Sequence, residues 1–427
     1  MKKYISHQFP RELKIYITLL VASIATIIII LYFLQIAEYA HFIFQKIVKD
    51  NTYLNLLITP LIFITVIYID RKYCHFVGGS GVPQLVAAND SRNKKIRLQL
   101  LSIPIALIKI LLVSVATIGG ASISFGGPSA HIGGSIFYHF AHLIKIKRKF
   151  LIHSFIAIGG SAGLIIAFNA PIAGFLFAYE EIGRKLKKQM LLLIAFFSVI
   201  VYLISSFYYQ QQVYLANLAH LSIDLSLAYQ LIPLIILCAV FGGLFAKSAI
   251  FLINQFALRE LKKVLFFVFG LALIVALLNI LTNGQTAGSG YDQTQQLLSG
   301  QTVTPYFALA KFLASLASFV TTVAGGIFMT SISIGAAIGA EIINFIEVKP
   351  QIVMIIASIA YLSAVIRAPL SSTFLVLEMT SSFNLLFVAI IAGYISSFIS
   401  KAICRQALYE SLADSYLSIS HNTFKKV

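Results

Sequence analysis

The chain has 427 residues, of which 59% are hydrophobic and only 11% are charged. A soluble protein of this length needs a more polar surface, so the composition excludes a soluble globular domain and predicts an all-α polytopic membrane protein in contact with lipid. The net charge of +17 does not indicate a nucleic-acid partner, because the basic residues form short clusters between apolar runs, at 92–97, 145–149 and 184–188. Such clusters follow the positive-inside rule and predict that both termini lie in the cytoplasm.

Apolar runs follow one another along the chain, and several are long enough to cross a hydrocarbon core. The first is too long for a signal peptide and no small-residue cleavage site follows it, so it predicts a retained span. Cys74, Cys238 and Cys404 are too widely separated to indicate a disulfide framework or a metal site. No nucleophile lies beside a base, so neither an enzyme nor a cofactor is expected. The runs cover 15–36, 54–69, 101–118, 151–167, 189–208, 231–256, 264–282, 307–329, 352–365 and 371–399.

A glycine-rich break interrupts this pattern at residues 119–134, which contain six glycines and a proline. No Asp or Glu occurs between Asp90 and Glu180, so the break offers backbone amides and no carboxylate. Non-helical backbone survives at membrane depth only where it is packed in protein or faces a watery cavity, and a helix N-terminus there carries a partial positive charge. Glycine beside Ser, Thr or Pro marks three candidate N-termini, which together predict anion permeation: residues 79–83, 126–130 and 326–331.

Two segments far apart in the chain share a second pattern. Residues 169–181 and residues 367–379 both contain Ala-Pro near their start, followed by apolar residues and a glutamate. Glu180 and Glu378 each come nine residues after the proline of their segment. A residue that recurs in both halves of a repeat is more often structural than functional, so we expect structural roles for these two glutamates.

A glycine-rich break lies upstream of each of these segments, at 119–134 and at 325–339. Glycine-interrupted apolar segments at matching places in two halves indicate an internal repeat with a substrate site between the halves. The sequence therefore predicts a single transmembrane domain, 1–427, with repeat halves at about 15–190 and 205–400. The spacing alone does not decide whether the halves are inverted.

The motifs together resemble those of the CLC family of chloride channels and proton/chloride exchangers. Gly79-Ser80-Gly81-Val82-Pro83 resembles the family motif Gly-Ser-Gly-Ile-Pro, and Gly326-Ile327-Phe328-Met329-Thr330 is similar to Gly-x-Phe-x-Pro, with threonine in place of the proline. Asn169 to Glu181 resembles the segment that carries an inner proton glutamate. Ala407-Leu408-Tyr409 resembles the segment that brings a tyrosine hydroxyl to the chloride. The likeness is to prokaryotic-type members without cytoplasmic CBS domains.

This resemblance implies a fold, an assembly and a set of anion contacts. The fold is an inverted repeat with many tilted and broken helices, and the assembly is a homodimer with one pore per subunit. The C-terminal segment, 401–427, contributes Tyr409. Chloride is the expected bound ion, since nitrate exchangers tend to have proline at position 80, and fluoride exporters also depart from the Ser and Tyr pattern. The implied contacts are the hydroxyls of Ser80 and Tyr409, the backbone N–H groups near Ile327 and Phe328, and the outer amides of Gly126 and Gly127.

The chain departs from the family pattern at one place. The family motif Gly-Lys/Arg-Glu-Gly-Pro is replaced by Ser124-Phe125-Gly126-Gly127-Pro128, so Gly126 occupies the position of the gating glutamate. The inner proton position is retained as Glu181. We therefore expect passive, uncoupled chloride conduction in a bacterial inner membrane. Two alternatives stay open: a proton/chloride antiporter that uses Glu181, with His131 as a further candidate carrier, and a membrane protein that binds anions without transporting them.

Overall fold

The computed structural model describes residues 2–91, 93–183, 188–209, 213–257 and 259–424. Residue 92, most of the basic cluster at 184–188 and the end of the segment 401–427 lie outside the described residues. Every regular element in the described part is a helix, and its only ladder pairing is an isolated antiparallel bridge between Ser124 and Gly326. Eight helical stretches in this part are long and apolar enough to cross a membrane. The predicted all-α polytopic fold is confirmed.

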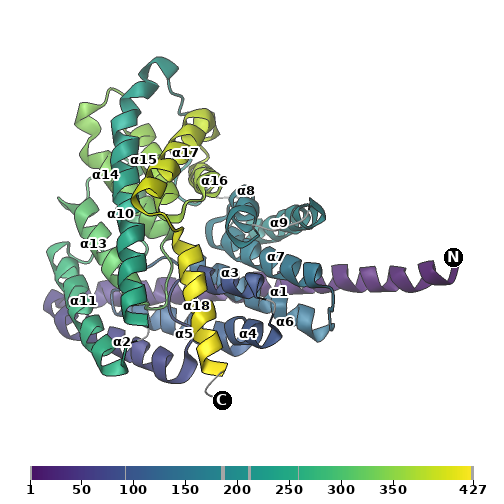
Figure 1. Cartoon of the computed structure of the whole chain (residues 1–427). Helices are drawn as coiled ribbons and strands as arrows, with labels where there is room; N and C mark the ends of the chain where they lie inside the picture. Colours follow the sequence, from purple (N-terminus) through teal and green to yellow (C-terminus); the bar gives the residue numbers. More distant parts are fainter. Residues whose placement is uncertain (1, 92, 184–187, 210–212, 258, 425–427) are drawn as a thin grey trace.

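The first part of the chain forms helices α1 to α9. Helix α1 has 49 residues, more than twice the roughly 20 that cross a hydrocarbon core. Figure 1 shows that it runs past the body of the molecule and projects beyond it at its N-terminal end. The bounds are α1 Lys2–Asp50, α2 Asn55–Ile69, α3 Val82–Asp90, α4 Lys94–Leu100, α5 Ile103–Ile118, α6 Gly126–Leu143, α7 Lys149–Phe168, α8 Pro171–Phe177 and α9 Lys188–Tyr209.

The second part forms helices α10 to α18. Helices α10, α15 and α17 pack together, and the C-terminal helix α18 lies against α3 from the first part. This contact brings the end of the chain to the glycine-rich segment that precedes α3. The bounds are α10 Ile232–Ala257, α11 Leu261–Leu281, α12 Tyr291–Leu298, α13 Phe307–Val320, α14 Phe328–Glu341, α15 Pro350–Ile366, α16 Pro369–Thr380, α17 Leu386–Ile403 and α18 Leu408–Phe424.

Several helices begin or end inside the protein instead of crossing it. Helix α5 ends at residue 118 and α6 begins at residue 126, and the predicted apolar run 307–329 is divided between α13 and α14. Glycine makes the turn before α3 possible, because Gly79 and Gly81 have φ angles of +72° and +94°, which side chains rarely allow. The breaks are buried, as is required of non-helical backbone at membrane depth.

The two halves pack their central helices in the same way. Gly133, seven residues after the start of α6, brings α6 so close to α7 that a Cβ on it would overlap the carbonyl oxygen of Gly159. Gly335, seven residues after the start of α14, does the same against α15, where a Cβ would lie 2.5 Å from the Cα of Ser358. Small residues allow this close approach of membrane helices. The matching positions of these two glycines reflect the repeat.

Candidate anion site

The three glycine-rich breaks meet in the middle of the protein. Ser124 and Gly326 exchange two backbone hydrogen bonds, both with an N···O distance of 2.7 Å. The amide of Gly79 donates to the carbonyl of Thr322 at 2.8 Å, and the amide of Gly325 donates to the carbonyl of Gly79 at 3.2 Å. The segments at residues 79, 124 and 326, which are far apart in the chain, therefore form one buried junction.

Three helices begin at this junction, at the places that the sequence predicts. Helix α3 begins at Val82, α6 at Gly126 and α14 at Phe328. Four amides at these helix ends have no hydrogen-bond acceptor among the described residues. Buried amides are almost always paired, and the ends of helices carry a partial positive charge, so this junction is suited to an anion. The four amides are those of Gly126, Gly127, Ile327 and Phe328.

Two hydroxyl groups complete the junction. The side chains of Ser80 and Tyr409 are 1% and 0% exposed, and neither oxygen has a hydrogen-bond partner among the described residues. Ser80 lies against α6, since a Cβ on Gly127 would overlap its Oγ and lie 2.8 Å from its carbonyl oxygen. The Tyr409 ring lies 6.2 Å from that of Phe328, the first residue of α14. Unpaired buried hydroxyls are unfavourable unless a ligand uses them.

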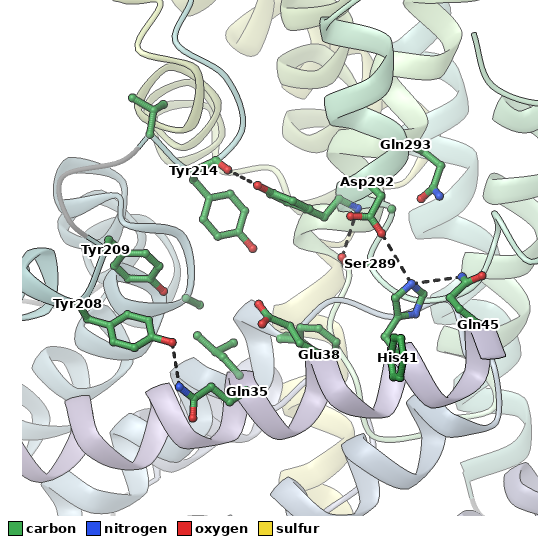
Figure 2. Close-up of a pocket in the computed structure, with 17 residues that line it drawn as sticks. Gln35, Glu38, His41, Gln45, Tyr208, Tyr209, Tyr214, Ser289, Asp292 and Gln293 are labelled. Atoms are coloured by element: carbon green, nitrogen blue, oxygen red, sulfur yellow. Dashed lines mark hydrogen bonds and ion pairs between the residues drawn. The ribbon is translucent and has the colours of Figure 1, made fainter. Parts of the chain in front are cut away.

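Two cavities adjoin the junction, and each is lined by a different set of residues. A tyrosine-lined cavity of about 510 Å³ includes Phe125 and Ala167. Figure 2 shows that its walls come from α1, α9, α12 and the segment of Tyr214, and that the Glu38 carboxylate points into it. A second cavity, the Ser80 cavity, measures about 270 Å³ and includes Ser80 and Arg71. Each cavity therefore adjoins the junction: Phe125 directly precedes Gly126, and Ser80 carries one of the two hydroxyls.

Glu181 and His131 take different positions beside the site. Glu181 is buried in a short π-helical turn, Ala178–Ile182. His131 is fully buried on α6, and its Nε2 donates to the carbonyl of Leu100 at 2.8 Å. This hydrogen bond makes His131 a packed polar residue in the resting structure. That either group carries a proton stays a hypothesis.

The repeated glutamates connect the two halves. The Glu180 carboxylate accepts hydrogen bonds from the amides of Leu370 at 3.1 Å and Ser371 at 2.7 Å, at the N-terminus of α16. The Glu378 carboxylate accepts hydrogen bonds from the amides of Ile172 at 2.9 Å and Ala173 at 2.8 Å, at the N-terminus of α8. Each half therefore caps the helix that follows the Ala-Pro pair of the other half. The expected structural role of both residues is confirmed.

Removing one of these caps will destabilise the protein. Glu378→Ala leaves two amides of α8 without an acceptor, and we expect a loss of about 1 to 2 kcal/mol in the free energy of unfolding, as for other caps. Glu378→Gln keeps one carbonyl oxygen and will lose less. Thermal unfolding of the purified protein in detergent measures both. Glu341→Ala, which removes an exposed carboxylate at the end of α14, is the control; a loss as large as that of Glu378→Ala would argue against capping.

Two buried lysines, one of which bonds to the junction, were not predicted from the sequence. Lys109 donates from Nζ to the carbonyl of Gly79 at 3.1 Å. Lys311 donates from Nζ to the carbonyls of Thr286 and Gly288, both at 2.9 Å. Each lysine lies 17 residues before the start of α6 or α14, from 109 to 126 and from 311 to 328. A single lysine within an apolar run is unusual, and that signal, repeated in both halves, could have identified them.

The voltage gated chloride channel family matches residues 61–401 of this chain. A slow cyanobacterial Cl−/H+ antiporter has a similar structure, with a TM-score of 0.83 and 20% identity over 95% of this chain and 98% of that one. A CLC-type fluoride/proton antiporter has a TM-score of 0.77 and 19% identity over 93% and 97% of the two chains. A eukaryotic CLC transporter has a TM-score of 0.78 and 20% identity over 95% of this chain and 74% of that one.

This chain therefore belongs to the CLC family of voltage gated chloride channels and related transporters. Its fold is the CLC-type inverted repeat, and its class of activity is anion transport across a membrane. The family that the motifs at residues 79–83 and 326–330 predict is confirmed.

Proposed function

We propose that this protein conducts chloride passively, without moving protons. The observation that carries this proposal is Gly126. It is the first residue of α6 and contributes an unpaired amide to the junction, but it has no side chain. A carboxylate at this place would compete with the anion for the amides and could carry a proton; glycine does neither. At the junction the anion then meets amide and hydroxyl donors, with no side chain of residue 126 among them.

The donors at the junction suit a halide ion. Taking an anion out of water costs several kcal/mol even after the protein relaxes, and one helix N-terminus does not offset that. Here the amides of α6 and α14 and the hydroxyls of Ser80 and Tyr409 act together. Charge-assisted hydrogen bonds of this kind are stronger than bonds between neutral groups. The Ser and Tyr pattern, which resembles that of chloride-carrying members, favours chloride as the ion.

A second candidate is a proton/chloride antiporter. Two similar structures are described as Cl−/H+ and fluoride/proton antiporters, and Glu181 is retained and buried in this chain. In this alternative, Glu181 receives the proton on one side and another group, with His131 as a candidate, passes it on. The buried His131 ring would have to leave the Leu100 carbonyl. The alternative therefore needs a rearrangement that passive conduction does not.

A reversal-potential measurement distinguishes these candidates. The purified protein is reconstituted into liposomes with opposed chloride and proton gradients, and the voltage at which net flux stops is measured. We expect that voltage to follow the chloride gradient alone. A voltage that shifts with the proton gradient, or uphill proton movement driven by chloride, would overturn passive conduction. The absence of any chloride flux would instead favour a protein that binds anions without transporting them.

The assembly and its orientation form part of the same proposal. We infer a homodimer with one pore per subunit in a bacterial inner membrane, and we expect both termini in the cytoplasm. The positive-inside rule supports this orientation, since it places the clusters at 92–97 and 145–149 in the cytoplasm. Arg71, which lines the Ser80 cavity, and Lys72 beside it support the same orientation, with this cavity on the cytoplasmic side. The tyrosine-lined cavity is then the external mouth.

A further inference from the structure

The space beside Gly126 is already filled. A Cβ added to Gly126 would overlap the ring of Phe168, with its Cζ only 2.6 Å away. Phe168 is the last residue of α7 and is 2% exposed. The ring of Phe168 therefore occupies the position that a side chain on residue 126 would take.

Phe168 also lies between the external mouth and the hydroxyls of the site. Its ring meets the edge of Tyr214, which lines the tyrosine-lined cavity, at a centroid distance of 5.6 Å. The centroid of the Phe168 ring also lies 6.3 Å from that of Phe328. The Phe328 centroid in turn lies 6.2 Å from that of Tyr409. These rings form a continuous series from the cavity to the anion site. The neighbours of the gate position, Phe125 and Ala167, line the cavity itself.

The repeat shows that the local fold does not require an aromatic ring at this position. In the second half, the equivalent of Phe168 is Ile366, since each residue ends its helix and is followed by a residue with positive φ. The first residue of the preceding helix differs between the halves in the opposite sense: Gly126 begins α6, whereas Phe328 begins α14. The first half therefore has the small residue at the helix start and the large ring at the helix end, and the second half has the reverse. The size of one residue complements that of the other.

We propose that Phe168 is the outer gate of this pore, an uncharged ring that closes the route between the tyrosine-lined cavity and the Ser80 and Tyr409 hydroxyls. This inference rests on the proposed chloride conduction. The anion passes when the ring turns away from Gly126, and it then meets the amides of α6. The ring edge carries a partial positive charge, so an anion can pass along it without repulsion. The gate works by size, where a carboxylate would work by charge.

Removal of the ring tests the gate. We expect Phe168→Ala to raise the rate of chloride efflux from liposomes by about tenfold, and Phe168→Leu, which keeps part of the bulk, to raise it by less. The matched control is Phe155→Ala, which removes an equally buried ring from the same helix, where it packs against Phe137. The control should leave the rate within about twofold of that of the unmodified chain. If Phe168→Ala does not yield folded protein, Phe168→Leu alone decides the question.

A second pair of variants tests the fit between the two residues. Gly126→Ala should slow efflux by about tenfold, because its methyl group and the ring compete for one space. Adding Phe168→Ala should restore the rate, a coupling that independent sites do not show. Unchanged rates in folded Phe168→Ala and Phe168→Leu would overturn the gate. The result is separate from proton coupling, because the gate is judged by the rate of efflux and coupling by the reversal potential.

Discussion

A glutamate at residue 126, in a chain whose Phe168 is already alanine, will make chloride flux fall at neutral pH and recover in acid. The alanine provides the room that Phe168 occupies in the unmodified chain. The ionised carboxylate will then accept hydrogen bonds from the amides at the start of α6 and compete with chloride there. Protonation removes the charge and the competition. Chloride efflux from liposomes should be about tenfold slower at neutral pH than in the Phe168→Ala parent and should approach the parent as the pH falls toward about 4, near the ordinary pKa of glutamate.

The parent variant is the control across the same pH range. Glu38, His41 and Asp292 line the tyrosine-lined cavity, so Phe168→Ala can have a pH dependence of its own, which must be subtracted. Gly126→Glu with Phe168 intact should be slow at both pH values, because the side chain has no room beside the ring. A pH profile identical to that of the parent would mean that residue 126 does not face the anion.

The three helix starts were predictable because glycine and proline are local signals. The breaks at 79–83, 126–130 and 326–331 lie where α3, α6 and α14 begin, and membrane depth leaves such backbone few alternatives. The equal spacing of Glu180 and Glu378 from their prolines also predicted a structural role. It did not predict the partner, because nothing local says that each carboxylate caps a helix of the opposite half.

Phe168 was not predictable as a gate residue for the same reason. In the sequence it is one apolar residue in an apolar run, next to Asn169, and its contact with Gly126 depends on how α7 crosses α6. The unpaired state of the Ser80 and Tyr409 hydroxyls likewise depends on tertiary packing. The sequence motif indicates the residues at a site, whereas the arrangement of the helices determines which space each side chain fills.

The crossing of α6 and α7 leads to a prediction about stability. Gly159 and Gly163 lie four residues apart on one face of α7, a spacing that lets membrane helices approach closely. A Cβ on Gly163 would overlap the carbonyl of Ser129 and lie 2.6 Å from the Cα of Ala130. Backbone does not rotate away as a side chain does. We therefore expect Gly163→Ala to lower the free energy of unfolding by about 3 kcal/mol, the upper end for overpacking, measured by thermal unfolding in detergent.

A glycine-to-alanine substitution at an open helical site should instead raise the free energy of unfolding. A Cβ on Gly270 of α11 would meet no atom within 4 Å, so Gly270→Ala should stabilise the protein by about 0.5 to 1 kcal/mol through helix propensity. If both variants unfold at the same temperature, α6 and α7 are not in backbone contact.

Gly163 lies on the same helix as Phe168, and its contact is with the first turn of α6. Displacing that turn moves Gly126 relative to the ring, so Gly163→Ala should also alter the chloride efflux rate, whereas Gly270→Ala should not.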